Sequence, residues 1–159
     1  KLALQIKCEL NNVTNLHASG EDFRWYFKVK CSNCGQFPPD FIYVCAAERV
    51  ELKDSRGDAN LVVRCKFCNR AGNLDILNES LTPYNAEDSG QFKTVAVFEC
   101  RGLELTEFSP RVGWSATCLH SGKEFNDISL TENNWADYDC ESACEVSILD
   151  VESRFIKVK

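Results

Sequence analysis

Four cysteines stand in two Cys-x-x-Cys pairs, Cys31/Cys34 and Cys65/Cys68, with 30 residues between the pairs. Two intervening residues let the chain turn tightly enough for both sulfur atoms of a pair to reach one ion. Four thiolates provide the closed tetrahedral ligand set that structural Zn²⁺ sites use. The spacing therefore predicts one zinc ion per chain, held by two hairpin ends that the fold brings together.

The residues around each pair fit a structural zinc site better than a redox site. The residue after such a pair often takes a left-handed backbone conformation, which Gly35 adopts freely and Asn69 adopts tolerably. A redox pair would instead need an exposed thiol of low pKa, usually at a helix N-terminus. Here a strand-like run leads into Cys31 and Pro38-Pro39 follows the pair. Thiol redox chemistry or metal transfer therefore stands as the alternative hypothesis.

A second metal site is conceivable at Cys118, His120, Cys140 and Cys144, because the last two are spaced like ligands and the histidine would complete the set. Nothing in the sequence fixes the two segments close together, so free thiols and a loop histidine are the favoured interpretation. The other cysteines alternate with apolar neighbours and are expected in the core; they are Cys8, Cys45 and Cys100.

The 159-residue chain has a formal charge of −6 and an isoelectric point near 5.0. A binder of nucleic acid or of an anionic membrane would carry a basic face instead. No apolar run approaches the roughly 20 residues of a membrane span, and no signal-peptide core is visible. Cys-x-x-Cys pairs without such a signal favour a reducing compartment, the cytoplasm or else the nucleus. No catalytic triad, glycine-rich phosphate loop or paired-carboxylate site stands out, which argues against an enzyme.

Strands must position these cysteines, and alternation of apolar and polar residues marks them. The clearest run, 23–31, delivers Cys31 to the metal, and the run 61–65 carries the second pair. The other expected strands are 2–10, 41–45, 50–53, 94–100, 103–108, 113–118, 125–130 and 145–158. The segments expected outside strands are 11–20, the turn 54–58, the acidic linker or exposed loop 83–90, the acidic loop 133–139 and a short helical turn at 140–146.

The second half of the chain echoes the first. The run from Trp114 to Cys118 resembles the run from Trp25 to Cys31, and Ser121 then stands where Cys34 stands in the first half. These matches predict an all-β fold of two stacked, pseudo-symmetric β-meander repeats that form one compact unit. The first repeat, 1–82, would keep the zinc, and the second, 83–159, would carry a degenerate knuckle.

Two acidic segments, 83–88 and 135–139, carry the aromatic residues Tyr84, Trp135 and Tyr138. Loops rarely contain large aromatics unless these pack on the core or contact a partner. We expect these loops to bind a basic protein partner, and packing on the core is the alternative for Trp135. On that hypothesis zinc content and folding survive charge reversal of the four carboxylates Glu87, Asp88, Asp137 and Asp139.

Motifs along the whole chain are similar to one known family. They are Gly20-Glu-Asp-Phe-Arg-Trp25, Lys30-Cys-Ser-Asn-Cys-Gly35, Arg64-Cys-Lys-Phe-Cys68, Pro83-Tyr-Asn-Ala-Glu-Asp88, Phe98-Glu-Cys-Arg-Gly-Leu-Glu104 and Trp135-Ala-Asp-Tyr-Asp139. In this order they resemble the eukaryotic CXXC-motif-containing zinc-binding protein family, whose molecular role is not established. The resemblance implies two stacked β-meanders with one zinc in the first, and its ligands would be Cys31, Cys34, Cys65 and Cys68. The chain departs from the family pattern at Leu105, where proline is common, and in the extra cysteines Cys45, Cys118, Cys140 and Cys144.

The sequence as a whole predicts a monomeric, non-enzymatic zinc-binding protein that acts through contacts with a protein partner it does not identify. The competing class is a protein that uses its Cys-x-x-Cys pairs for thiol redox chemistry or metal transfer. Tight zinc with inert thiols would favour the first class, whereas labile zinc and fast thiol alkylation would favour the second.

Overall fold

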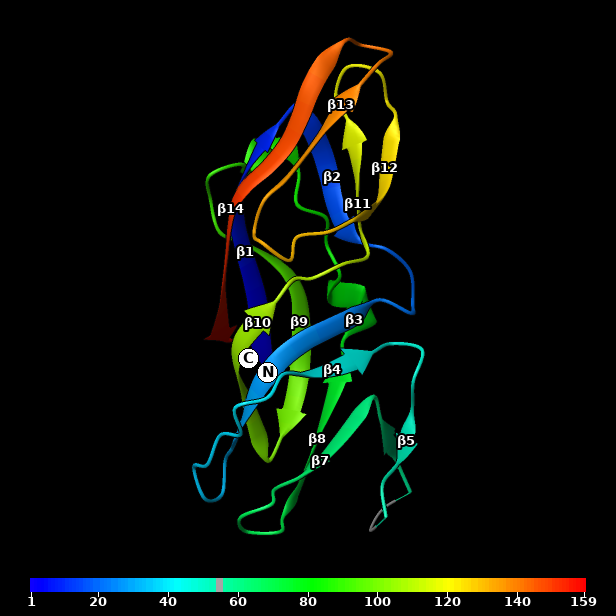
Figure 1. The fold of residues 1–159 in the computed structure, drawn as a ribbon. Coiled ribbons are helices and arrows are strands. Elements are labelled where there is room, and N and C mark those ends of the chain that lie inside the picture. The colour runs from blue at the N-terminus through cyan, green and yellow to red at the C-terminus, as the bar shows by residue number, and fades with distance from the viewer. Residues whose placement is uncertain (54–55) are drawn as a thin grey trace.

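A computed structural model describes residues 1–53 and 56–159, and it confirms the expected all-β fold (Figure 1). Two short 3₁₀ helices, η1 (Asn78–Ser80) and η2 (Ala86–Asp88), lie between the strands at Ala71–Ile76 and Lys93–Arg101. None of the helices in the described part of the chain has the length and hydropathy needed to cross a membrane. The strands are β1 (Leu2–Asn11), β2 (Val13–Ala18), β3 (Arg24–Cys31), β4 (Ile42–Cys45), β5 (Val50–Glu51), β6 (Asp58–Ala59), β7 (Leu61–Arg64), β8 (Ala71–Ile76), β9 (Lys93–Arg101), β10 (Leu103–Ser109), β11 (Trp114–Cys118), β12 (Glu124–Ile128), β13 (Trp135–Asp139) and β14 (Cys144–Lys157).

A six-stranded antiparallel sheet, in the order β13-β14-β1-β9-β8-β7, runs the length of the molecule. Its two central strands, β1 and β9, open the two halves of the chain. On either side lies a strand of the other half: β14 pairs with β1, and β8 pairs with β9. The sheet is therefore symmetric about its central β1–β9 pair. In this symmetry β1 corresponds to β9, β8 to β14 and β7 to β13.

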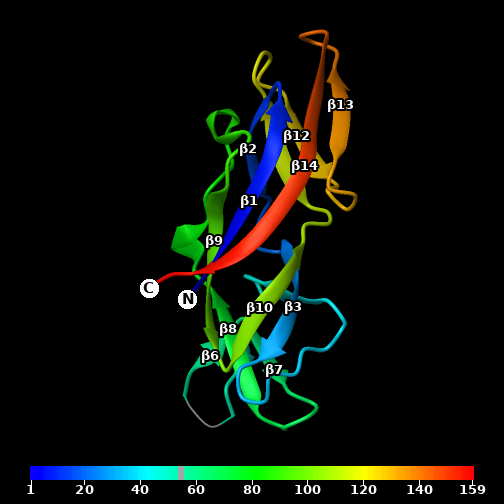
Figure 2. The same ribbon diagram turned by 90° about the vertical axis from the view of Figure 1, so that its left-hand side faces the viewer.

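Two three-stranded sheets, β10-β3-β4 and β12-β11-β2, show the same exchange. Strand β10 from the second half pairs with β3, and β2 from the first half pairs with β11. The two views show an elongated molecule in which β3, β7 and β8 lie toward one end and β11, β12 and β13 toward the other (Figures 1 and 2). The strands of the two halves thus interleave, and each end contains strands from both.

An aromatic cluster joins the two ends in the core. The rings of Trp25 and Trp114 lie 6.0 Å apart in an edge-to-face arrangement, and both are almost fully buried. Phe23 contacts both tryptophans, with ring centroids 4.8 and 5.0 Å away, and Phe98 lies 5.8 Å from Trp25. Edge-to-face aromatic pairs of this kind add about 0.5–1.5 kcal/mol each to the burial of their area. The tryptophans that mark the second half as an echo of the first therefore meet at the centre of the molecule.

The structure contradicts three expectations for the segments outside the strands. Segment 11–20 contains β2, whose buried residues Val13 and Leu16 are three apart because Asn15 has a positive φ of 57°. Segment 135–139 is the edge strand β13, which is mostly exposed and so lacks apolar alternation. The expected helical turn at 140–146 is a turn followed by β14. Strand β8 was also not foreseen, because Gly72 and its polar neighbours obscure its buried positions.

The segment 83–90 is not an exposed linker. Tyr84 is completely buried, and its backbone forms an antiparallel bridge with Leu16 through hydrogen bonds of 2.8 and 2.9 Å. Its hydroxyl group lies 2.5 and 2.6 Å from the carbonyl oxygens of Asp88 and Gln91. Tyr84 therefore anchors the segment to the core, whereas Glu87 in the same segment is exposed. Of the expected turn at 54–58, Asp58 belongs to β6, where it pairs with Glu51 of β5, and residues 54 and 55 lie outside the described residues.

Candidate metal centre

The first Cys-x-x-Cys turn follows directly from β3. The N–H of Cys31 donates to the Gln36 carbonyl at 2.9 Å, and the N–H of Gly35 donates back to the Cys31 carbonyl at 2.9 Å. Gly35 has a φ of +79°, so the glycine supplies the left-handed residue that the turn requires. The turn also rests on the β9–β10 connection, because the Ser32 N–H donates to the Gly102 carbonyl at 3.1 Å.

The second Cys-x-x-Cys turn joins β7 to β8 and has the same hydrogen bonds. Cys65 donates to the Arg70 carbonyl and Asn69 donates to the Cys65 carbonyl, both at 2.9 Å. Asn69 has a φ of +66°, as the sequence predicts. The Arg64 guanidinium donates to the Asn69 carbonyl at 2.6 Å and so restrains the turn.

The four predicted cysteines converge on one point, and all four sulfur atoms lie within 4.8 Å of one another. The Cys31–Cys68 and Cys34–Cys65 sulfur pairs are 3.7 and 3.6 Å apart. A tetrahedral ion with Zn–S bonds of about 2.3 Å needs sulfur atoms about 3.8 Å apart. The ligand type and the spacing therefore both fit Zn²⁺, and the four thiolates would complete its coordination.

Before a metal binds, the four thiols differ in acidity. The side chain of Asn33 and the backbone N–H of Arg70 lower the pKa of Cys68 to about 6 by hydrogen bonding to its sulfur. The Gln36 backbone amide lowers the pKa of Cys34, but desolvation and hydrogen bonds with the neighbouring thiols outweigh it and raise the pKa to about 11. Since zinc binds thiolates, the ion must displace protons from this set.

The opposite end of the molecule repeats this backbone geometry. Cys118 donates to the Lys123 carbonyl at 2.8 Å, and Gly122, with a φ of +75°, donates to the Cys118 carbonyl at 3.0 Å. The next residue, Leu119, donates to the Asn12 carbonyl at 2.9 Å, as Ser32 does to Gly102. The turn from Cys118 to Ser121 therefore has the form of a metal knuckle.

The facing turn, between β13 and β14, matches the turn between β7 and β8. Asp139 pairs with Cys144, five positions later in the chain, as Cys65 pairs with Arg70. Ala143 has a left-handed φ of +53°, as Asn69 has in the other turn. Asp139 therefore takes the place of Cys65, and Ser142 takes the place of Cys68. The Asp139 carboxylate accepts hydrogen bonds of 2.5 and 2.6 Å from the hydroxyls of Ser121 and Ser142, which hold its pKa below the usual range. Sequence comparison of the two halves identified Ser121 but missed Asp139 and Ser142, because neither is a cysteine.

Of the four residues considered for a second metal site, the structure brings only Cys118 and Cys144 together. Cys118 and Cys144 lie close together, and the third group beside them is Asp139. His120 instead contacts the Asn12 side chain at 3.1 Å, and Cys140 is exposed. The other cysteines differ in burial: Cys8 and Cys45 are buried as expected, whereas Cys100 is only partly buried.

The acidic segments are more structural than the sequence suggests. Asp88 binds Lys93 at 2.8 Å and accepts the Asn85 N–H at 2.8 Å, and Asp139 is completely buried. Only Glu87 and Asp137 of the four carboxylates are exposed. These contacts argue against the expectation that folding survives reversal of all four charges, because Asp88 and Asp139 would lose their partners.

The aromatic residues of these segments follow the same division. Tyr84 lies in the core, and Trp135 packs edge-to-face on Phe125 with ring centroids 5.4 Å apart. Packing on the core, the alternative considered for Trp135, is thus what the structure has. Tyr138 remains exposed.

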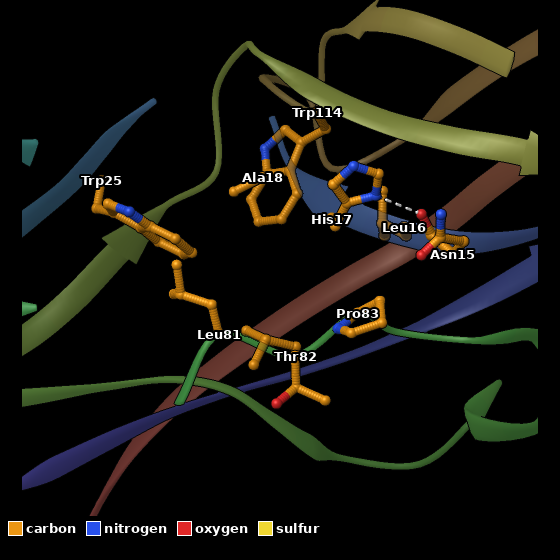
Figure 3. Close-up of a pocket in the computed structure, with 10 residues that line it drawn as sticks. Asn15, Leu16, His17, Ala18, Trp25, Leu81, Thr82, Pro83 and Trp114 are labelled. Carbon is orange, nitrogen blue, oxygen red and sulfur yellow. Dashed lines mark hydrogen bonds between the residues drawn. The ribbon is translucent and has the colours of Figure 1, made fainter. Parts of the chain in front are cut away.

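A surface pocket of about 280 Å³ lies between β2, the segment after η1 and the core tryptophans (Figure 3). His17 is the single titratable group among the residues that line it, and one of its ring nitrogens lies 2.8 Å from the Asn15 carbonyl oxygen. Trp25, Leu81 and Trp114 contribute apolar surface. Among the described residues that line the pocket, no carboxylate, cysteine or second histidine accompanies His17.

Fold and site together define an all-β protein with a four-cysteine centre suited to Zn²⁺. The chain belongs to the family described as CXXC motif containing zinc binding protein, eukaryotic, whose model matches residues 3–156. The human and Xenopus laevis proteins named CXXC motif containing zinc binding protein are 46% and 48% identical to it, over 99% of this chain and 98% of theirs.

Solved structures show the same relationship. The crystal structure of C1orf123 is 46% identical, has a TM-score of 0.95 and covers 99% of both chains. A hypothetical protein from Plasmodium falciparum is 28% identical, with a TM-score of 0.88 over 98% of both chains. The family assignment supports zinc as the metal that the four-cysteine site takes.

Proposed function

We propose that the protein is a non-enzymatic zinc-binding protein in which one ion, at Cys31, Cys34, Cys65 and Cys68, is structural. The observation that carries this proposal is the convergence of all four sulfur atoms, which leaves no coordination position for water or substrate. The ion would hold together the turn that follows β3 and the turn between β7 and β8. The test is to count bound zinc in Cys34→Ser and Cys68→Ser, each of which should lose the ion of this centre.

We also propose that a protein partner binds to the surface around the four-cysteine centre. Phe37 and Phe67, each within three residues of a ligand, are both 66% exposed. The two turns that carry the ligands, 30–36 and 64–70, contain four cationic side chains and no carboxylate. Their charge of +4 is larger in magnitude than the −2 of a Zn²⁺ ion with four thiolates, so the zinc end is positively charged. Exposed aromatic groups beside cations suit an acidic protein segment with apolar side chains.

This proposal places the partner at the zinc end and not at the acidic segments 83–88 and 135–139, where the sequence led us to expect it. The Phe37→Ser/Phe67→Ser variant should retain its zinc and its unfolding midpoint but lose partners captured from the source cell. Val112→Ser is the matched control, since Val112 is 60% exposed and lies in the connection between β10 and β11. Equal capture by the double variant and the native chain would contradict the assignment of this surface.

The competing function is thiol redox chemistry or metal transfer at the same cysteines, in a cytoplasmic or nuclear monomer. The exposure of Cys34 is the observation in its favour. The two functions differ in zinc lability: a structural ion resists a chelator and protects the thiols from alkylation, whereas a transferred ion exchanges rapidly. Catalytic reduction of insulin by the zinc-loaded chain would favour the redox function.

A further inference from the structure

We propose that Cys118, Asp139 and Cys144 form a second Zn²⁺ site, at the end of the molecule opposite the four-cysteine centre. One ligand atom from each of the three residues lies within 4.8 Å of the others. Cys118 and Asp139 are almost completely buried, and Cys144 is partly buried. The site lies where the β11–β12 and β13–β14 turns meet, toward the end that Figure 1 shows at the top.

The backbone that presents these groups is already that of a metal site. Both turns have the hydrogen bonds or left-handed residues of the zinc knuckles, so the chain needs no rearrangement to point the first and third ligand positions at one ion. Two of the four positions carry Ser121 and Ser142 instead of cysteine. Cys144 supplies a second thiol from the strand position directly opposite Asp139, outside the four knuckle positions.

The charge at this point favours a cation. Asp139 is buried, and no lysine or arginine of the described residues forms an ion pair with it. Its Oδ2 accepts from Ser121 and Ser142, and its Oδ1 accepts from the Glu141 N–H at 3.1 Å. The Cys118 thiol also hydrogen-bonds to this carboxylate, which completes the roughly four acceptor positions of a carboxylate. As a thiolate ligand Cys118 would donate no proton, so the position that it occupies would become available for a metal ion.

The donor set selects Zn²⁺ among the common ions. Thiolates exclude Mg²⁺ and Ca²⁺, and a carboxylate ligand disfavours Cu⁺, whereas Zn²⁺ binds both donor types. Three protein ligands leave the fourth position to water or to the Ser142 hydroxyl, which lies 3.0 Å from the Cys144 sulfur and 3.8 Å from that of Cys118. A site with an open position and a partly exposed ligand should bind zinc more weakly than the four-cysteine centre.

The test counts zinc on the full chain. Native protein is dialysed against buffers of increasing free Zn²⁺, and bound zinc is measured by mass spectrometry. We expect two zinc ions per chain at saturation, where the sequence alone predicts one, and the second should be removed first by a chelator. Cys118→Ser/Cys144→Ser should saturate at one. Cys140→Ser, which removes the exposed cysteine of the same turn, should still bind two.

Two further measurements keep the test decisive if the double variant does not fold. Asp139→Asn should weaken the second equivalent by more than about tenfold, in line with the sensitivity of zinc sites to their carboxylates. In native protein the second equivalent of Co²⁺ should add a sulfur-to-metal charge-transfer band. Saturation of the native chain at one zinc, or a second zinc that survives in Cys118→Ser/Cys144→Ser, would overturn the proposal.

Discussion

Ser121 donates a 2.5 Å hydrogen bond to the Asp139 carboxylate in the positions that Cys34 and Cys65 occupy at the other end of the molecule. Matched backbone turns therefore hold two different kinds of cross-link. At one end four sulfur atoms converge, and at the other hydroxyl groups converge on a buried carboxylate. The second end remains tied together through hydrogen bonds to a charge, which are stronger than hydrogen bonds between neutral groups.

The Ser121–Asp139 bond should contribute to stability in a pH-dependent way. Ser121→Ala and Asp139→Asn should each lower the free energy of unfolding at pH 7, and the double variant should lose less than the sum of the two. The hydroxyls lower the pKa of Asp139, so its contribution is present above the ordinary carboxyl pKa of about 3.9 and disappears as the pH falls through the lowered value. Chemical unfolding of the four proteins at pH 7 measures the coupling, and strictly additive losses would contradict it.

The four-cysteine centre should carry a large part of the stability. Cys34→Ser should remove the zinc of that centre, whose binding is worth on the order of 10 kcal/mol in isolated zinc peptides, and thermal unfolding should shift sharply downward. Cys68→Ser should do the same because it removes the opposite ligand. The matched control is Cys140→Ser, which changes an exposed cysteine outside the four ligands. Full retention of this zinc in a Cys31/Cys34 double variant would show that the site lies elsewhere.

The sequence predicts this centre well because the information is local. Each Cys-x-x-Cys pair, with Gly35 or Asn69 after it, specifies its own turn, and the alternating run from Trp25 specifies the strand that leads to Cys31. The exchange of β2 and β10 between the two ends is not visible in this way, because pairing between distant strands leaves no periodic signal. The same holds for Asp139, whose role depends on a serine 18 residues away rather than on its neighbours in sequence.

The zinc affinity of the four-cysteine centre should decrease as the pH is lowered, and the decrease should become steeper below pH 6. Cys34, with a pKa near 11, is protonated at neutral pH, so zinc must displace its proton at pH 7 and below. Cys68, with a pKa near 6, is already a thiolate at pH 7 but becomes protonated below pH 6. Each proton that zinc displaces lowers the apparent affinity by about tenfold per pH unit. The slope of the logarithm of the apparent zinc affinity against pH should therefore increase by one below pH 6. Competition with a chelator of known pH dependence measures this slope, and a slope that stays constant through pH 6 would contradict the assignment.

Close packing of Gly72 against the β9–β10 turn should also support the zinc end. A Cβ atom at this position would lie 3.0 Å from the Arg101 carbonyl oxygen and 3.0 Å from the Leu103 side chain. Gly72→Val should therefore lower the free energy of unfolding by about 1–3 kcal/mol, as overpacking does. It should also weaken zinc binding, because the same turn holds Ser32 through the Gly102 carbonyl. Ala71→Val, one residue away on an exposed side chain, should change neither quantity.

The two acidic segments should separate into structural and exposed carboxylates when their charges are reversed. Asp88→Lys should lower the free energy of unfolding by about 2 kcal/mol, because it replaces an acceptor of charged hydrogen bonds with a like charge beside Lys93. Asp139→Lys should be more damaging, since its side chain is completely buried.

Glu87→Lys and Asp137→Lys are the matched controls in the same two segments, and both residues are exposed. These two variants should unfold at the native denaturant midpoint and keep the zinc of the four-cysteine centre. If the Asp88 and Asp139 variants were as stable as these controls, the hydrogen bonds at Lys93 and Ser121 would not stabilise the fold. A loss of partner binding in Glu87→Lys/Asp137→Lys, with Phe37→Ser/Phe67→Ser unaffected, would instead move the contact surface from the zinc end to the acidic segments.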